Sequence, residues 1–327
     1  MTSSLPKSTR CDPCVLCEGT EFEVLSQHDR KGRPLTTALC GRCGLVSHEA
    51  IPNDDQLAEY YARHYRIDYH GEYSPSARRV LREWRRGNEL VQHLSPYIRD
   101  RESVFEVGAG MGCNVKQFEL AGLTASGIEP GRGFQQFAER QLLANVSYGF
   151  LQDLDPLNQY DIVLLVHVLE HFNQPTQAMR KIRQLLNPGG QLYVEVPNLE
   201  APHSSPGKLF HFAHVYNFTR PTLTMLARKC GFRIKRVLSS SNAKSLMVLL
   251  ERTDEERFTL DASSYECSRS AISRYNRISY HLRWSYMRDR WQTLHRQHGA
   301  RLFANDRLAR ILSVCRRPKQ TPMNRAA

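Results

Sequence analysis

The sequence predicts an α/β fold with a doubly wound sheet, preceded by a small metal ribbon and followed by a basic helical extension. Three observations support this prediction. Over residues 103–129, a short apolar run ends in a glycine-rich turn, and a helical segment and a second apolar run follow. Two Cys-x-x-Cys pairs lie in the first 50 residues. Arginine dominates the C-terminal part of the chain, where apolar residues recur at helical spacing.

The glycine-rich turn indicates a site for an adenosyl ligand. Gly108, Gly110 and Gly112 follow the first apolar run, and Glu129 ends the second. Glycines let a backbone approach a ligand closely because no Cβ stands in the way. A carboxylate about 20 residues further on is placed to accept hydrogen bonds from the hydroxyls of a ribose. Glu106 lies within the same motif.

Two later segments continue the pattern of buried strands. Residues 160–166 form an apolar run that leads to His167, Glu170 and His171. Such a run is typical of a strand that helices cover on both faces. The carboxyl ends of these strands are where open α/β sheets bind ligands. Residues 186–198 then contain a Pro-Gly-Gly turn and a further strand, and residues 232–238 and 245–251 are expected to be strands six and seven, the last antiparallel.

Over residues 100–250, these segments resemble the class I S-adenosylmethionine-dependent methyltransferases, with the glycine turn as their motif I. The resemblance implies a seven-stranded Rossmann-like core and S-adenosyl-L-methionine as cofactor. In such enzymes an acid after strand three binds the adenine amine; Asp153 is the candidate, and a solvated loop acid is the alternative. Glu170 is expected to be structural, either capping a helix or pairing with an arginine. The resemblance implies a donor site formed by Glu106, Gly108, Gly110, Gly112, Glu129, Asp153, His167 and, from the preceding segment, Tyr69.

The cysteine pairs predict a structural zinc ribbon over residues 1–50. Cys14 and Cys17 form one pair, Cys40 and Cys43 the other, and 22 residues separate the pairs. Tetrahedral zinc takes four thiolates, and a domain this small needs such a staple to fold. Cys11 is an alternative ligand, because its spacing to Cys14 is also that of a zinc knuckle.

Residues 51–100 are expected to link the ribbon to a core at 101–251. A helix is predicted over residues 77–98. Tyrosines recur in the first half of the linker, including Tyr65 and Tyr69. They are either packing residues or part of a lid over the methyl donor, which is their place in similar enzymes.

A long loop after the Pro-Gly-Gly strand predicts the acceptor site. Loops of such length are usually functional. His214 and Phe218 resemble a His-x-x-x-Phe-Ser/Thr stretch of sugar and small-molecule methyltransferases, in which the histidine is the proposed base. We expect His214 to remove the acceptor's proton, with His171 as second candidate; the alternative is that His214 only anchors the loop. The chemistry is expected to be metal-independent, because Gln174 and Pro175 offer no ligand beside the histidines of residues 167–171.

Charge separates the tail from the rest of the chain. From Ser268 onward the chain contains 13 Arg and one Lys but only two Asp. Its net charge of +12 equals that of all 327 residues, so the rest of the chain is neutral overall. The tail, residues 252–327, is expected to be helical, with a stripe of Ile272, Tyr275, Ser279, Leu282 and Tyr286. The stripe docks on the core or on a second subunit, which would make a homodimer; otherwise the tail contacts RNA or an anionic membrane surface. Without an apolar N-terminal segment, a cytoplasmic location with reduced cysteines is expected.

These observations lead to an enzyme prediction with two alternatives. We expect methylation of a saccharide, a sugar nucleotide or another polar small molecule, on oxygen or carbon, as in carbohydrate biosynthesis. The first alternative is an RNA methyltransferase that grips the backbone with ribbon and tail. The second is an inert scaffold that only binds the donor; the intact glycine turn and Glu129 argue against it.

Overall fold

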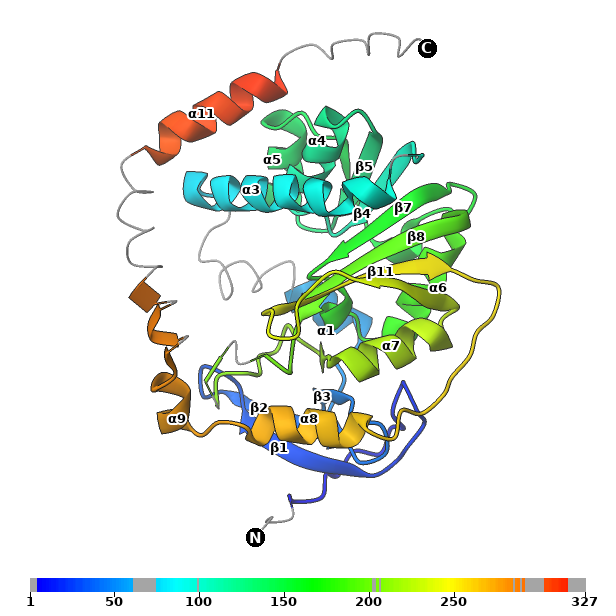
Figure 1. The fold of residues 1–327 in the computed structure, drawn as a ribbon, viewed down its shortest axis with the longest axis vertical. Coiled ribbons are helices and arrows are strands. Elements are labelled where there is room, and N and C mark those ends of the chain that lie inside the picture. Colours follow the sequence, from blue (N-terminus) through cyan, green and yellow to red (C-terminus); the bar gives the residue numbers. More distant parts are fainter. Residues whose placement is uncertain are drawn as a thin grey trace. The chain divides into compact units, whose positions relative to one another are not determined.

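The computed structural model describes two compact units, whose elements are drawn in Figure 1. The first comprises residues 1–58 and 165–290, and the second residues 59–164 and 291–327. The described residues are 5–60, 75–98, 100–201, 204–205, 207–284, 286–288, 290–291 and 303–316. Tyr65, Tyr69 and His203 lie outside these ranges. The unit boundary falls within the predicted core, near the end of one strand.

The ribbon at the N-terminus is a small antiparallel sheet in the first unit. Its strand order is β1-β2-β3-β9, with bounds Phe22–His28, Pro34–Cys40, Val46–His48 and Tyr216–Asn217. The fourth strand therefore comes from the predicted acceptor loop, about 170 residues further along the chain. Val46 pairs with Asn217 and Ser47 with Tyr216. The ribbon is thus built into the first unit by main-chain hydrogen bonds.

The core sheet has seven strands in the order β10-β11-β8-β7-β4-β5-β6. Strands β4, β5 and β6 pair in parallel, whereas β11 is antiparallel to both β8 and β10. The predicted doubly wound α/β core is confirmed, including the antiparallel seventh strand. The bounds are β4 Ser103–Val107, β5 Thr124–Glu129, β6 Val146–Tyr148, β7 Tyr160–Val166, β8 Leu186–Pro197, β10 Phe232–Val237 and β11 Ser245–Arg252.

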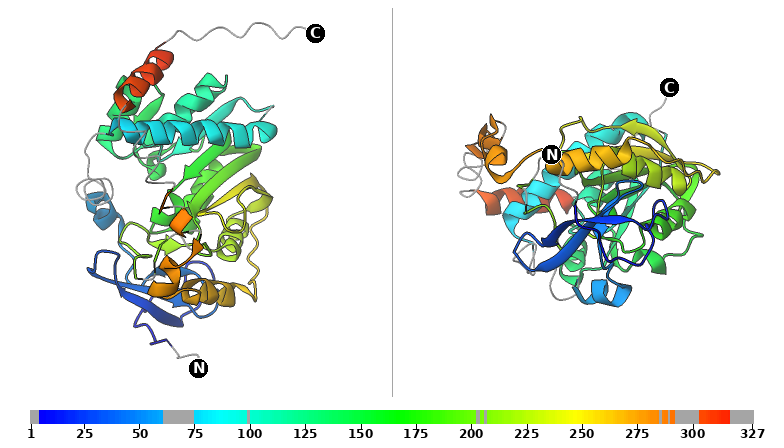
Figure 2. Two further views of the ribbon diagram at one scale, coloured as in Figure 1. Left: turned by 60° about the vertical axis from the view of Figure 1, so that its left-hand side comes forward. Right: turned by 90° about the horizontal axis from the view of Figure 1, so that it is seen from below.

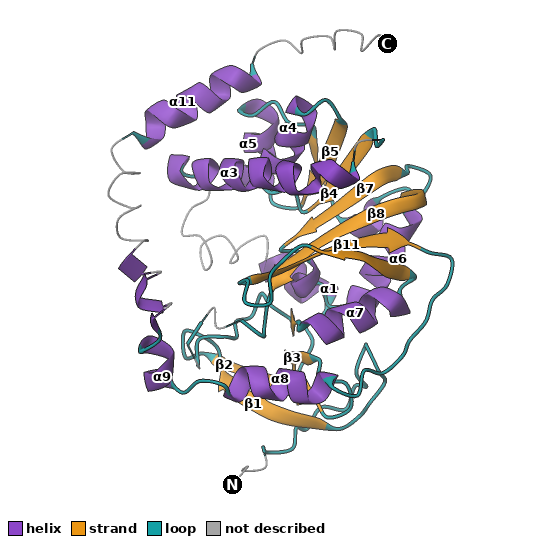
Figure 3. Ribbon diagram, in the orientation of Figure 1, coloured by secondary structure: helices purple, strands orange, loops and turns teal. Residues whose placement is uncertain are grey.

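Helices alternate with the core strands, as Figure 3 shows. Residues 162–165 of β7 are fully buried, in agreement with a strand covered on both faces. The helical bounds are α1 Asp54–Glu59, α3 Ala77–Leu94, η2 Ser95–Tyr97, α4 Cys113–Leu120, α5 Arg132–Arg140, η3 Leu151–Asp153, η4 Leu169–His171, α6 Pro175–Gln184 and α7 Arg220–Lys229.

Helix α3 packs against α4 within the second unit. Val80, Leu90 and Leu94 are buried on the same side of α3. Gly87 lies where a Cβ would come within 3.0 Å of the Asn114 side chain and 3.2 Å of the Cys113 carbonyl. The helix predicted over residues 77–98 is therefore confirmed, and its glycine permits close contact with the helix that follows the glycine turn.

The tail helices are α8 Ser264–Ser273, α9 Arg277–His281 and α11 Ala304–Cys315. Figure 2 shows α8 beside the ribbon strands, where the Tyr265 hydroxyl donates a hydrogen bond to Glu23. The predicted stripe is wrong in part, because the chain leaves the helix between Ser273 and Arg277 and the register changes. Leu282 is 70% exposed, and Tyr280 is buried instead. Among the described residues, no helix is long and apolar enough to span a bilayer.

Candidate functional site

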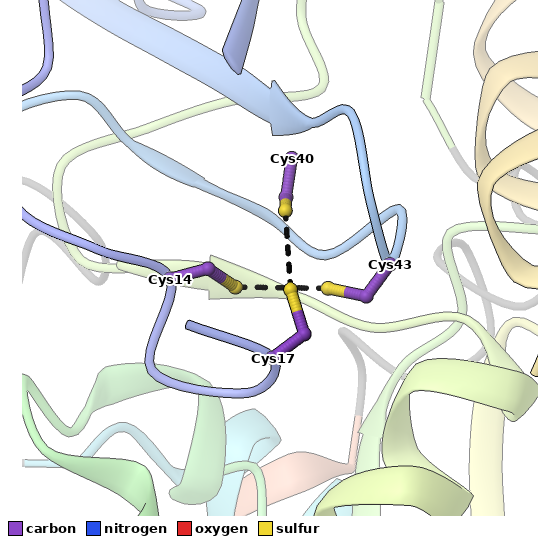
Figure 4. Close-up of side chains that lie close together, drawn as sticks. All are labelled: Cys14, Cys17, Cys40 and Cys43. Atoms are coloured by element: carbon purple, nitrogen blue, oxygen red, sulfur yellow. Dashed lines mark hydrogen bonds between the residues drawn. The ribbon is translucent and has the colours of Figure 1, made fainter. Parts of the chain in front are cut away.

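Four cysteine side chains of the ribbon point toward one another (Figure 4). The sulfurs of Cys14 and Cys43 are 3.6 Å apart, and those of Cys17 and Cys40 are 3.5 Å apart. Zn–S bonds of about 2.3 Å in a tetrahedron place sulfurs about 3.8 Å apart. All four side chains are buried, whereas Cys11 is exposed and lies outside the cluster. The four residues fit a structural zinc ion, as the spacing predicts.

The knuckle turns are held from outside the ribbon by unit 1. The Lys229 ammonium group of α7 donates to the carbonyls of Val15 and Leu16. On the other knuckle, Gly44 has φ +71°, and a Cβ there would lie 2.6 Å from the Ser264 carbonyl oxygen. Only glycine fits this conformation and this contact with α8.

The ribbon also positions the predicted acceptor loop. The amide of His48 donates to the Val215 carbonyl at 3.0 Å. Burial lowers the pKa of the His48 imidazole to about 4, so its Nε2 donates as N–H to the Phe212 carbonyl, 3.0 Å away. Two main-chain groups on either side of His214 are therefore fixed by a ribbon residue, a link that no sequence motif indicates.

The donor side of the site lies in the second unit and is organised by Glu129. Its carboxylate accepts a hydrogen bond from the Gly110 amide at 2.9 Å and from the Gly131 amide at 2.7 Å. Glu129 is 8% exposed. The carboxylate thus ties the glycine turn to the end of β5, and its predicted contact with a ribose stays a prediction.

The glycines of the turn have different tasks. Gly108, Gly110 and Gly112 all have positive φ, which favours glycine. A Cβ at Gly112 would lie 2.8 Å from the Ala138 Cβ, so this glycine permits packing. A Cβ at Gly110 would meet none of the described residues within 4 Å. Packing within the described part of the chain therefore does not require a glycine here, whereas a ligand held close to the main chain would.

Glu106 is a buried acid beneath this turn. It is 2% exposed and accepts a hydrogen bond from the Asn114 amide at 2.6 Å, while its Oε2 has no partner among the described residues. Burial, with the charges of Glu129 and Glu83, raises its pKa to about 8, although the bond from Asn114 opposes this shift. Glu106 therefore holds its proton near neutral pH.

The raised pKa predicts a specific pH dependence of stability. In the unfolded chain the carboxyl titrates near 4.5, so the folded state binds the proton more tightly. The stability that Glu106 contributes is complete below about pH 4.5 and is lost as the pH rises through about 8. Glu106→Gln resembles the neutral acid and removes this loss. We expect the variant to gain up to a few kcal/mol over the natural chain between about pH 5 and 9. Urea unfolding across that range measures it, and parallel curves for both proteins would contradict it.

Other predicted donor residues lie in different surroundings. Asp153 is exposed in η3, and its carboxylate accepts from the Phe150 amide at 3.3 Å. An adenine contact by Asp153 stays a prediction. Tyr69 lies outside the described residues. His167 belongs to the first unit and has φ +55°, a strained conformation for a non-glycine residue that often marks functional sites.

The first unit gathers histidines around Glu170, which is 1% exposed. Its Oε1 lies 3.5 Å from His167 Nδ1, 3.9 Å from His171 Nε2 and 3.9 Å from His214 Nε2. Neither carboxylate oxygen accepts a hydrogen bond from the described residues. The expectation that Glu170 caps a helix or pairs with an arginine is therefore wrong, because the loop of residues 199–216 brings histidines to it.

His167 carries a positive charge between two acids. Its Nε2 lies 3.1 Å from Glu195 Oε1, and the Tyr193 hydroxyl donates to the same carboxylate. Burial alone would lower the pKa of His167, but the nearby carboxylates of Glu170 and Glu195 outweigh it and raise the pKa to about 9. The one His167 side chain thus lies beside two buried carboxylates.

His171 and His214 are held in fixed orientations. His171 Nδ1 lies 2.6 Å from the Ala213 carbonyl, which only accepts, so Nδ1 carries the proton. Rings of His211 and His214 lie 3.8 Å apart, and those of His171 and His214 5.1 Å. Burial, aided by nearby cations, lowers the pKa of His211 to about 2, so His211 is neutral.

The two histidines predicted to be catalytic are thus brought together, and Glu170 joins them. The sequence argument against a metal considered only neighbours of His167 and His171. It missed His214 as a third donor, because 42 residues separate it from His171 and only the loop conformation closes that gap. A buried strand followed by His-x-x-Glu-His, and a long loop rich in histidine, were the available signals.

Comparison with known proteins agrees with the fold. A family described as a methyltransferase domain matches residues 76–237. The tRNA U34 carboxymethyltransferase of Photobacterium profundum is 28% identical over 206 residues, which cover 58% of this chain and 60% of that protein. The ubiquinone biosynthesis O-methyltransferase of Pseudomonas savastanoi pv. phaseolicola is 31% identical over 104 residues, covering 30% of this chain and 45% of that protein. The chain therefore spans three fifths or less of the length of these relatives.

Among solved structures, the magnesium protoporphyrin IX methyltransferase (ChlM) from Synechocystis PCC 6803 with bound SAH aligns with a TM-score of 0.46. It is 17% identical and covers 62% of this chain and 100% of that chain. The methyltransferase domain match covers the glycine turn, Glu129 and the Glu170 cluster. This match and the sheet order identify residues 76–237 as a class I S-adenosylmethionine-dependent methyltransferase domain.

Proposed function

We propose that this protein transfers a methyl group from S-adenosyl-L-methionine to a polar acceptor. The observation that carries the proposal is the hydrogen bond from the Gly110 amide to Glu129, at a glycine where an added Cβ would meet no described residue within 4 Å. That arrangement suits a ribose-bearing ligand. Glu129 and the glycine turn, which we propose for the donor, belong to the second unit, and the Glu170 cluster belongs to the first.

Methyl transfer requires that the acceptor atom attack the methyl carbon and that the acceptor lose a proton. In methylation of a hydroxyl, the acceptor oxygen bonds to the methyl carbon, the S–CH3 bond breaks, and its electron pair goes to sulfur. The hydroxyl proton must also leave. Histidines assist such transfers when they titrate near neutrality. We propose that His214 removes this proton, with His171 as the second candidate.

We propose a saccharide or a similar polar small molecule as acceptor, on oxygen or carbon. The support is the likeness of His214 and Phe218 to the stretch in sugar and small-molecule methyltransferases. RNA is a second candidate, because several matching relatives are named for tRNA and because the arginine-rich tail suits a phosphate backbone.

Methyl-labelled donor and fractionated cell extract test the acceptor class. We expect label in a sugar or sugar-nucleotide fraction, with mild dependence on salt. Label in RNA, lost steeply as ionic strength rises, would instead support the second candidate. Mass spectrometry of the product identifies the group that was added. Donor binding without label in any fraction would contradict the enzyme proposal.

Replacing His214 by asparagine is expected to lower turnover by about 10²-fold or more, as loss of a proton-transfer group typically does. Calorimetry with the donor should show unchanged affinity, because Glu129 and the glycine turn lie in the second unit and His214 lies in the first. His28→Asn, a change at an exposed histidine of β1, is the matched control and should turn over normally. Full turnover by the His214 variant would remove this residue from the mechanism.

A further inference from the structure

Both oxygens of the Glu170 carboxylate are buried and accept no hydrogen bond from the described residues. Burying a carboxylate without compensation is costly, so some cation or proton must lie nearby. The His167 ring lies between two buried carboxylates, with Nδ1 3.5 Å from Glu170 Oε1 and Nε2 3.1 Å from Glu195 Oε1. Glu170 therefore shares this ring with Glu195, and a further cation beside Glu170 would compensate its burial.

The distances also point to a cation rather than to direct hydrogen bonds. Nε2 atoms of His171 and His214 both lie 3.9 Å from Glu170 Oε1, beyond hydrogen-bonding range. Two ligand atoms that bind one ion at about 2.0–2.2 Å lie at most about 4.3 Å apart. The three ligand atoms all lie within 4.8 Å of one another, so small side-chain movements would close the ligand set.

The orientation of His171 strengthens this reading. Its Nδ1 proton is committed to the Ala213 carbonyl, so in the neutral ring the Nε2 lone pair faces Glu170. A lone pair and a carboxylate repel unless a proton or a metal ion lies between them. Metal-binding histidines commonly donate their other ring N–H to a carbonyl in this way. The His211 ring packs on His214, with ring centroids 3.8 Å apart, and so helps to fix its orientation.

We propose that Glu170, His171 and His214 bind a divalent transition-metal ion, separate from the zinc of the cysteine ribbon. Two imidazoles and one carboxylate suit zinc, manganese, iron or cobalt, whereas magnesium and calcium prefer oxygen ligands. Three protein ligands leave coordination positions open, as in catalytic sites.

This inference rests on the proposed function for its role and changes one part of it. An ion in this position would bind the acceptor's oxygen and lower the pKa of its hydroxyl. His171 and His214 would then act as ligands, and the proton would leave from an acceptor already activated by the ion.

Cobalt binding to the full-length protein tests the site. Weakly held metal is removed by brief chelation, the ribbon zinc is verified by elemental analysis, and Co²⁺ is titrated at constant pH. We expect one Co²⁺ per chain beside the retained zinc, with d–d absorption but without the thiolate charge-transfer band of a cysteine site. Glu170→Gln and His214→Asn should each weaken Co²⁺ binding by about 100-fold or more. His28→Asn should bind Co²⁺ as the natural chain does.

Each outcome decides the question. Absence of Co²⁺ beyond the ribbon, or unchanged affinity in Glu170→Gln, overturns the metal site. Retained ribbon zinc and an unchanged thermal midpoint show that each variant is folded, because the ribbon belongs to the same unit as Glu170 and His214. Methyl transfer by a protein that binds no Co²⁺ at this site would contradict the metal proposal and support the proposed function. Co²⁺ binding by a protein that does not bind the donor would support the metal site and contradict the proposed function.

Discussion

Glu129→Ala is expected to weaken binding of S-adenosylmethionine on the order of 100-fold, because the two charge-assisted hydrogen bonds that we propose between Glu129 and the ribose would be lost. The same change leaves the amides of Gly110 and Gly131 without their carboxylate acceptor, so the turn itself loses its anchor. Isothermal titration calorimetry with the donor and with S-adenosylhomocysteine measures the effect.

Two further variants separate the causes. Glu129→Gln keeps the side-chain size but places an NH2 group against one of the two amide donors, so it should also bind weakly. Glu139→Ala removes an exposed acid of α5 in the same unit and should bind the donor normally. If Glu129→Ala keeps full affinity, the adenosyl site is not where we place it, and the proposed function fails with it.

Cys43→Ser is expected to destabilise the ribbon by several kcal/mol, because binding of a structural zinc ion is itself part of the folding free energy. The effect should reach the histidine loop, since β3 pairs with β9 and His48 holds the Phe212 carbonyl. We therefore expect loss of zinc, a lower thermal midpoint and reduced methyl transfer together.

Cys11→Ser is the matched control, because this exposed cysteine lies outside the cluster. It should keep zinc content, thermal midpoint and turnover. Elemental analysis and thermal unfolding of both variants make the comparison. Equal zinc content in the two variants would contradict the assignment of Cys43 as a ligand.

Local patterns predicted much of the fold because each depends on neighbouring residues. The bare turn at Gly110 and the acid at Glu129 are about 20 residues apart, and strand–turn–helix geometry brings them together. The choice of Cys14 over Cys11 was likewise predicted, from the matching shape of the two knuckles. The stripe in the tail failed, because periodicity does not show that the chain leaves the helix before Arg277.

By itself, the sequence determined the sheet type and the ribbon cysteines, both of which follow from short-range spacing and strand alternation; the donor residues stay a prediction. Only the tertiary structure decided that β9 completes the ribbon sheet, that His48 supports the acceptor loop, and that His214 meets Glu170. These contacts join segments about 40 to 170 residues apart in the sequence. Their formation depends on how packing closes long loops, and no local sequence pattern indicates the free energy of that closure.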